Sequence, residues 1–201
     1  PRLIEDDYTV TDAVVVGSLL ITLLRHADRV SMANLAQLVN VIAPIRTEPG
    51  GPAWRQTTFF PFQLTAAAAH GTVVVPTVES ASIETTKHGA VAAVDAVATV
   101  DGDEIVVFAA HRDLDEASEV VIDLDRGIAA ADALVVTVPE GGDRHTVNSA
   151  QAQPVAPASL ATVVDGTRVH LPLPPLSWAR ITLRAAAERN ERNREHLHRR
   201  R

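Results

Sequence analysis

Residues 94–110, "VDAVATVDGDEIVVFAA", hold two β-rich runs on either side of the pair Asp101-Gly102. An Asp-Gly pair between two such runs is the strongest short-range signal for a β-hairpin, because its tight turn needs positive φ angles. The pair Asp165-Gly166 separates two further runs in the same way. These two pairs therefore predict antiparallel hairpins in this part of the chain.

Short β-rich runs recur from about residue 72 onward. They are "TVVVPTV", "VDAVATV", "EIVVFAA", "EVVIDL", "ALVVTV", "TRVHLPL" and "ARITL". Short strands separated by such turns are typical of a two-sheet sandwich. We expect residues 72–185 to form an all-β antiparallel sandwich. Residues 186–201 have no apolar stripe, and we expect a charged tail that is disordered or a solvated helix.

Residues 1–70 have a different pattern. The run at 12–28 is apolar on a broad side and predicts a helix packed on a sheet, followed by a second helix within 57–69. The run at 30–40, "VSMANLAQLVN", is apolar without strict alternation, as in a parallel strand buried on both faces. A long loop rich in Pro and Gly separates this run from the second helix.

This order predicts an α/β barrel fragment, the last βα unit of a TIM barrel, placed before the sandwich. A single parallel strand has no neighbour within residues 1–70 to pair with its backbone groups. The first residues, "PRLIEDDYTV", also resemble the middle of a protein. We therefore expect the remaining barrel to precede Pro1.

Composition excludes several classes of function. The chain has no cysteine, which excludes disulfides, thiolate metal sites and cysteine nucleophiles, and favours a reducing compartment. A formal charge of −7 argues against nucleic acid, and no run reaches the roughly 20 apolar residues that span a membrane. The eight histidines lack metal-ligand spacing, and no nucleotide-binding loop is present, so we expect neither a metal nor a cofactor.

Gln37 is the strongest single candidate for ligand binding. It lies near the end of the expected strand, just before the long loop. In a barrel, active-site residues lie at the carboxyl ends of the strands, where an amide can bond a sugar hydroxyl. The alternative is a structural amide that satisfies backbone groups inside the barrel, and the pattern alone slightly favours that alternative.

Four strings of sequence resemble a known family. "LLRHADRVSMANLAQLVNVIAPI", followed by "TEPGGPAWRQTTFFPF", is similar to the end of the catalytic barrel in α-L-arabinofuranosidases of glycoside hydrolase family 51. "VNSAQAQPVAP" and "LPLPPLSWARITL" resemble the end of that family's C-terminal sandwich. The resemblance covers residues 3–185.

The resemblance implies a retaining hydrolase that removes terminal α-L-arabinofuranosyl groups from arabinan or arabinoxylan oligosaccharides. Such enzymes use one glutamate as acid/base and a second as nucleophile. In this family both lie on earlier barrel strands, so we expect both upstream of Pro1. Glu5, Glu48, Glu79 and Glu84 match neither motif, so the chain alone is expected to be inactive.

The same resemblance implies that Gln37 contacts the sugar in the arabinose subsite. It places Trp54 on a loop at the rim, where the indole either shapes the cleft or braces the loop. Family members are commonly intracellular and oligomeric, which implies a cytoplasmic homo-oligomer. The alternative function is a non-catalytic sandwich module for carbohydrate binding or subunit interaction, which the scarcity of aromatic residues in 72–185 weakens.

Overall fold

The computed structural model describes residues 5–186 of the 201-residue chain. Within them lie the helices α1 (Val10–Arg25) and α2 (Phe59–Ala68). The strands are β1 (Ile45–Thr47), β2 (Ala53–Arg55), β3 (Thr72–Val74), β4 (Ser82–Thr85), β5 (Gly89–Ala92), β6 (Val94–Asp101), β7 (Glu104–His111), β8 (Ser118–Asp123), β9 (Ile128–Val136), β10 (Ala158–Leu160), β11 (Val163–Asp165), β12 (Arg168–Leu173) and β13 (Ser177–Ala185). The predicted charged tail lies, apart from Ala186, outside the described residues.

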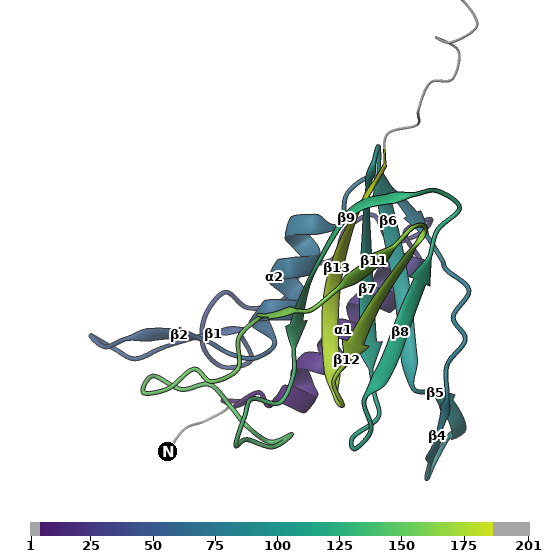
Figure 1. Cartoon of the computed structure of the whole chain (residues 1–201). Helices are drawn as coiled ribbons and strands as arrows, with labels where there is room; N and C mark the ends of the chain where they lie inside the picture. The colour runs from purple at the N-terminus through teal and green to yellow at the C-terminus, as the bar shows by residue number, and fades with distance from the viewer. Residues whose placement is uncertain (1–4, 187–201) are drawn as a thin grey trace, which may run out of the picture.

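The elements form three layers (Figure 1). A six-stranded sheet with the order β10-β9-β13-β7-β6-β3 is the central layer. A three-stranded sheet, β11-β12-β8, covers one of its faces, and α1 and α2 cover the other. All strand pairs within residues 5–186 are antiparallel, so the predicted antiparallel sandwich is confirmed.

Strand β7 shows how one sequence run serves two cores. Ile105, Val107 and Ala109 face the core between the two sheets. Phe108 and its neighbours on the opposite face pack in the core beneath the helices. Because both faces are buried, the run "EIVVFAA" is continuously apolar instead of alternating.

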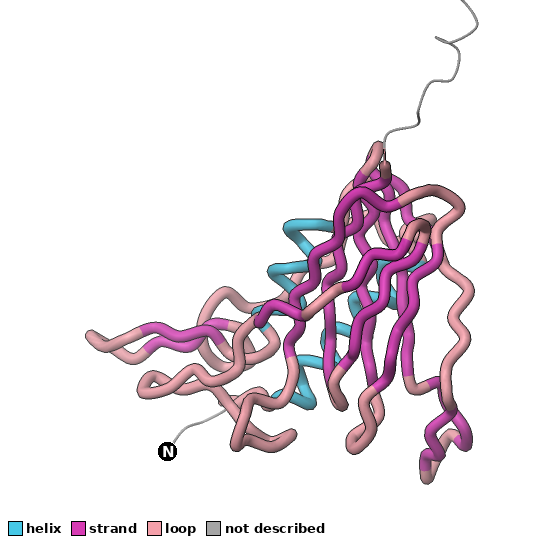
Figure 2. The backbone as a smooth tube through the Cα atoms, in the orientation of Figure 1, coloured by secondary structure: helices cyan, strands magenta, loops and turns pink. Residues whose placement is uncertain are grey.

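Both predicted hairpin turns are present. Asp101 pairs with Glu104 across the β6–β7 turn, where Gly102 has a φ of 60°. Asp165 pairs with Arg168 across the β11–β12 turn, and Gly166 has a φ of 62°. Each glycine takes the positive φ that a residue with a side chain adopts only with strain. Each of the seven predicted runs contains a strand. The small β1–β2 and β4–β5 hairpins were not expected; they project from the body in Figure 2.

Helix α1 begins with a reciprocal cap. Thr9 is the N-cap, its hydroxyl accepts from the Asp12 N–H, and the Asp12 carboxylate accepts from the Thr9 N–H at 2.7 Å. This capping box satisfies donors that the first helical turn leaves without intrahelical partners. At the other end His26 is the C-cap.

We expect Thr9→Ala to lower the free energy of unfolding by about 1 kcal/mol, the usual effect of removing a Thr N-cap. Thr22→Ala is the matched control, since Thr22 lies within α1 and its hydroxyl bonds only the Ser18 carbonyl. Urea denaturation of both variants measures the difference. Equal stability of the two variants would show that the cap contributes nothing.

The structure does not confirm the buried parallel strand predicted for residues 30–40. No strand forms there, and the segment is irregular and mostly exposed, with Met32 at 76% and Leu38 at 79%. A parallel strand needs a neighbour for its backbone hydrogen bonds, and residues 5–186 offer none beside this segment. The described residues therefore do not form the barrel unit that was predicted for residues 1–70.

The helices of that region pack directly on the sandwich. Gly17 and Ile21 of α1 and Leu64 of α2 are buried against the six-stranded sheet. Arg25 at the end of α1 pairs with Asp95 of β6, which also pairs with Arg112 at 2.8 Å. No helix within residues 5–186 has both the length and the apolar character needed to cross a bilayer.

Candidate functional site

Gln37 lies in the irregular segment between α1 and β1. Its side chain is exposed, so its amide needs no internal partner. The structural alternative, an amide bonded inside a barrel, therefore has no counterpart within the described residues. The position of Gln37 therefore depends on the contacts that anchor its segment, because a loop without regular structure positions a side chain only when its ends are anchored.

Asn40 anchors the segment three residues after Gln37. Its side chain donates to the Thr47 hydroxyl at 3.0 Å and accepts from the Thr47 N–H at 2.7 Å. Its backbone N–H donates to the Ile45 carbonyl, and its φ of 61° lies in the left-handed region that Asn tolerates better than most residues. These bonds close residues 40–47 into a compact turn.

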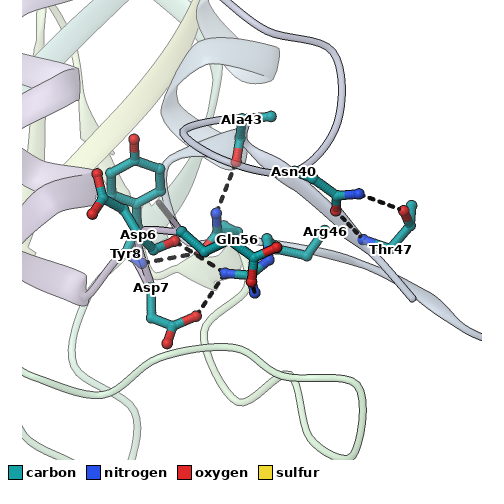
Figure 3. Close-up of polar contacts among 9 residues, drawn as sticks. Asp6, Asp7, Tyr8, Asn40, Ala43, Arg46, Thr47 and Gln56 are labelled. Atoms are coloured by element: carbon teal, nitrogen blue, oxygen red, sulfur yellow. Dashed lines mark hydrogen bonds and ion pairs between the residues drawn. The ribbon is translucent and has the colours of Figure 1, made fainter. Parts of the chain in front are cut away.

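Arg46 forms the centre of this framework (Figure 3). The guanidinium is buried, and its ion pairs reach Glu5 at 2.6 Å and Asp7 at 2.8 Å. It also donates to the Asp6 carbonyl at 3.2 Å. A buried cation is tolerated only when it is paired and hydrogen-bonded, so Arg46 holds residues 5–7 against β1.

Gln56 is the buried amide of this region. It is 1% exposed, donates to the Ala43 carbonyl at 2.8 Å, and accepts from the Tyr8 N–H at 3.1 Å. The Tyr8 hydroxyl donates to the Ile42 carbonyl at 2.9 Å. Together with Arg46 and Asn40, these residues tie the N-terminal segment to both ends of the turn that follows Gln37. We call this set the anchoring network.

Trp54 lies on β2, half-buried and directly across from Arg46 in the hairpin. The Arg46 guanidinium sits over its ring at 5.6 Å from the ring centre. This contact uses one part of the indole to brace the β1–β2 hairpin. Trp54 and Gln37 are thus joined to the same framework, although no direct contact links them.

The anchoring network escaped the sequence analysis. Arg46 offers one signal, since it follows the apolar residues of "VIAPI", whereas Gln56 stands between Arg55 and Thr57 and offers none. Glu5 and Asp7, which precede α1, pair with Arg46. Carboxylates engaged with a guanidinium in this way position backbone. They are not arranged as the separated acid and nucleophile of a glycosidase.

Tyr8 gives this network a pH dependence. Burial raises the pKa of Tyr8, and the carboxylates of Asp6 and Asp12 raise it further. Because the folded pKa lies above the unfolded one, the associated stability is present below the unfolded value, about 10, and is lost as pH rises through the folded pKa. Ionisation also removes the proton that Tyr8 donates to Ile42.

We expect the phenolate absorbance to appear at a higher pH in the folded chain than in urea. Tyr8 is the chain's only tyrosine, so the ultraviolet titration reports this residue alone. Tyr8→Phe should remove the loss of stability above about pH 10. Identical titration curves in the folded and unfolded chain would contradict the expectation.

The sandwich offers no aromatic platform for a sugar. Its aromatic residues are Phe108 and Trp178, which stack with ring centres 6.1 Å apart in the core beneath the helices. Both are fully buried, so they act in packing. This burial argues against the carbohydrate-binding alternative for residues 72–185.

Comparison with known proteins gives the family. A family model described as the α-L-arabinofuranosidase C-terminal domain matches residues 1–177. The chain belongs to this family. The exo-α-(1→6)-L-arabinofuranosidase of Bifidobacterium longum is 46% identical over 187 residues, covering 90% of this chain and 36% of that protein. The intracellular exo-α-(1→5)-L-arabinofuranosidase of Streptomyces lividans is 45% identical, covering 90% of this chain and 28% of that protein.

Solved structures agree with this assignment. A family 51 α-L-arabinofuranosidase from Bifidobacterium longum superposes with a TM-score of 0.84 at 42% identity, over 91% of this chain and 36% of that one. The family 51 arabinofuranosidase from Xanthomonas axonopodis pv. citri gives a TM-score of 0.81 at 25% identity, over 92% of this chain and 37% of that one. This arabinofuranosidase C-terminal domain therefore spans about a third of the length of the relatives it matches.

Proposed function

We propose that this domain is the C-terminal portion of a retaining family 51 α-L-arabinofuranosidase, which removes terminal α-L-arabinofuranosyl groups from arabinan or arabinoxylan oligosaccharides. The observation that carries the proposal is the match of residues 1–177 to the family, with relatives named as arabinofuranosidases. In this proposal residues 1–70 close the catalytic barrel and residues 72–185 are its accessory sandwich.

Apolar side chains on the surface of residues 1–70 support this arrangement. Val15 and Leu19 of α1 are 52% and 58% exposed, and Leu38 beside Gln37 is more exposed still. Such side chains gain free energy when they are covered, at about 25 cal/mol for each Å² of apolar surface removed from water. The rest of the barrel is the cover that we propose. In the complete barrel, residues 30–40 gain the strand neighbours that they lack within residues 5–186.

The proposed chemistry divides between the two parts of the enzyme. One glutamate outside this chain protonates the leaving oxygen, and a second attacks the anomeric carbon to give a covalent glycosyl-enzyme that water hydrolyses. Gln37 hydrogen-bonds a hydroxyl of the arabinofuranosyl ring, and Trp54 borders the cleft at its rim. The anchoring network holds the turn after Gln37, so that its amide keeps one position relative to the sugar.

The proposed setting is the cytoplasm, and the proposed assembly is a homo-oligomer. Several relatives are named intracellular arabinofuranosidases, which supports the first point. The relatives' names differ between α-(1→5) and α-(1→6) linkages, so the proposal covers arabinofuranosyl oligosaccharides as a class.

The test is Gln37→Ala in the complete enzyme. Loss of one hydrogen bond to the sugar, about 1.4 kcal/mol, should lower kcat/KM for an aryl α-L-arabinofuranoside about tenfold. Gln63→Ala is the matched control, since Gln63 is an exposed amide on α2. Full activity in Gln37→Ala, or an equal loss in the control, would remove Gln37 from the proposed subsite.

A further inference from the structure

A loop of the sandwich reaches across to β2. Residues 137–157, which connect β9 to β10, lie beside the start of α1, where Val147 forms a β-bridge with Thr9. The Val10 N–H also donates to the Thr146 carbonyl at 3.1 Å. In Figure 1 this loop runs, in green, from the sheets to the side of the molecule that carries β1 and β2. The loop therefore joins the sandwich to the region that holds the β1–β2 hairpin.

Asn148 is the buried amide of this loop, with 4% of its surface exposed. Its side-chain NH₂ donates to the Val155 carbonyl at 2.8 Å and to the Arg55 carbonyl at 3.0 Å. Its side-chain oxygen accepts from the Val155 N–H at 3.0 Å. Replacing such an amide leaves its buried partners without hydrogen bonds, which is costly. Asn148 thus closes the loop on itself and fastens it to β2 at the same time.

Both backbone hydrogen-bonding groups of Arg55 are engaged by the loop. The Arg55 N–H donates to the side-chain oxygen of Gln153 at 3.2 Å, and the Arg55 carbonyl accepts from Asn148. The β1–β2 sheet has two strands of three residues each. A two-stranded hairpin is at best marginally stable by itself. The position of β2 therefore depends on these contacts from the sandwich.

Trp54 precedes Arg55 on β2, so its indole moves with the strand. The Arg46 guanidinium contacts the ring from the anchoring network, whereas Asn148 and Gln153 hold the backbone beside it from the sandwich. Trp54 is only half-buried, so part of it stays open to solvent. An indole offers a large, rigid apolar surface, on which the C–H groups of a sugar can pack.

We infer that Asn148 and Gln153 are positioning residues, which hold β2 so that the Trp54 indole contacts the part of an oligosaccharide beyond the scissile bond. This inference rests on the proposed function. In that proposal Gln37 binds the arabinofuranosyl group that is removed, and Trp54 borders the rim, where the remainder of the substrate leaves the cleft. The sandwich loop is then a determinant of selectivity for oligosaccharides over substrates that have no second sugar.

The test compares two substrates of the complete enzyme, an arabinofuranosyl trisaccharide and an aryl α-L-arabinofuranoside. Gln153→Ala and Asn148→Ala should each lower the ratio of kcat/KM for the trisaccharide to kcat/KM for the aryl substrate about fivefold, through a higher KM for the trisaccharide. A role in folding alone would reduce both values equally. Gln153 is exposed, so Gln153→Ala keeps the fold even where the loss of the buried Asn148 amide disturbs it.

Three further variants make the result specific. Trp54→Ala should lower the same ratio, and adding Gln153→Ala to it should lower the ratio no further, because both act through the indole. Gln151→Ala is the matched control, an exposed amide on the same loop, and should keep the ratio. An unchanged ratio in Gln153→Ala, or additive losses in the double variant, would overturn the inference. A complete enzyme that hydrolyses neither substrate would refute the proposed function, whereas an active enzyme with unchanged ratios refutes this inference alone.

Discussion

The 201-residue chain, assayed alone on an aryl α-L-arabinofuranoside, should turn over at least about 10⁴-fold more slowly than the complete enzyme. A positioned general acid/base contributes about 10²–10⁴ to the rate by itself, and a retaining glycosidase also needs a carboxylate nucleophile. The carboxylates of Glu5 and Asp7, which reach the anchoring network, are engaged with Arg46. Release of the aryl alcohol, followed by absorbance, measures the difference.

The assay needs a proof that the chain is folded. Circular dichroism and cooperative urea unfolding provide it for the same preparation. If a trace of turnover is seen, Glu48→Gln should leave it unchanged, because Glu48 has no catalytic place in the proposed site. Turnover by the chain alone within tenfold of the complete enzyme would refute the division of the site between this domain and the rest of the protein.

The sandwich could be predicted from sequence because its signals are local. Asp101-Gly102 and Asp165-Gly166 specify tight turns through backbone conformation alone, whatever packs around them. The short β4–β5 hairpin lacks such a pair, since Gly89, at a φ of 65°, follows Lys87-His88 rather than an Asp or Asn. The β1–β2 turn contains Gly50-Gly51, with a φ of 68° at Gly50, but each of its strands has only three residues.

The segment at 30–40 could not be predicted in the same way. Its apolar composition indicates burial, but burial there depends on strands that residues 5–186 do not supply. The structure accordingly leaves Met32 and Leu38 exposed. A pattern of apolar residues indicates that a segment is buried in the folded protein. The conformation of the segment depends on which packing and hydrogen-bonding partners are present.

The candidate site shows the same limit at the level of single side chains. One interpretation of the sequence made Gln37 a buried amide bonded to backbone groups, but its side chain is exposed. The buried amide is Gln56, and the buried cation is Arg46. Arg46 bonds Asp7, which lies 39 positions away, and Gln56 bonds Ala43 across a turn. No spacing in the sequence indicates these partners. Gln37 remains a prediction, now with an anchoring network that explains how the turn after it is held.

Gly17→Ala should destabilise the domain by about 3 kcal/mol, although alanine is normally the better helix residue by about 1 kcal/mol. Gly17 lies in the middle of α1, packed on the indole of Trp178. A Cβ at this position would lie 2.2 Å from Trp178 Cδ1 and 2.7 Å from Cγ, far inside contact distance. Trp178 is fully buried and stacked on Phe108, so its ring has no free space to move into. Urea denaturation measures the loss.

A double-mutant cycle shows whether the indole is the cause. Trp178→Leu is itself destabilising because it leaves a cavity, but it removes the ring that meets the added methyl group. The two changes should therefore couple, with the double variant about 2 kcal/mol more stable than the sum of the single effects predicts. Leu19→Ala, on the exposed side of the same helix, is the control for helix propensity and should change stability little. A stabilising or neutral Gly17→Ala, or additive effects in the cycle, would mean that α1 does not rest on Trp178 and that the helices are held on the sandwich by other contacts.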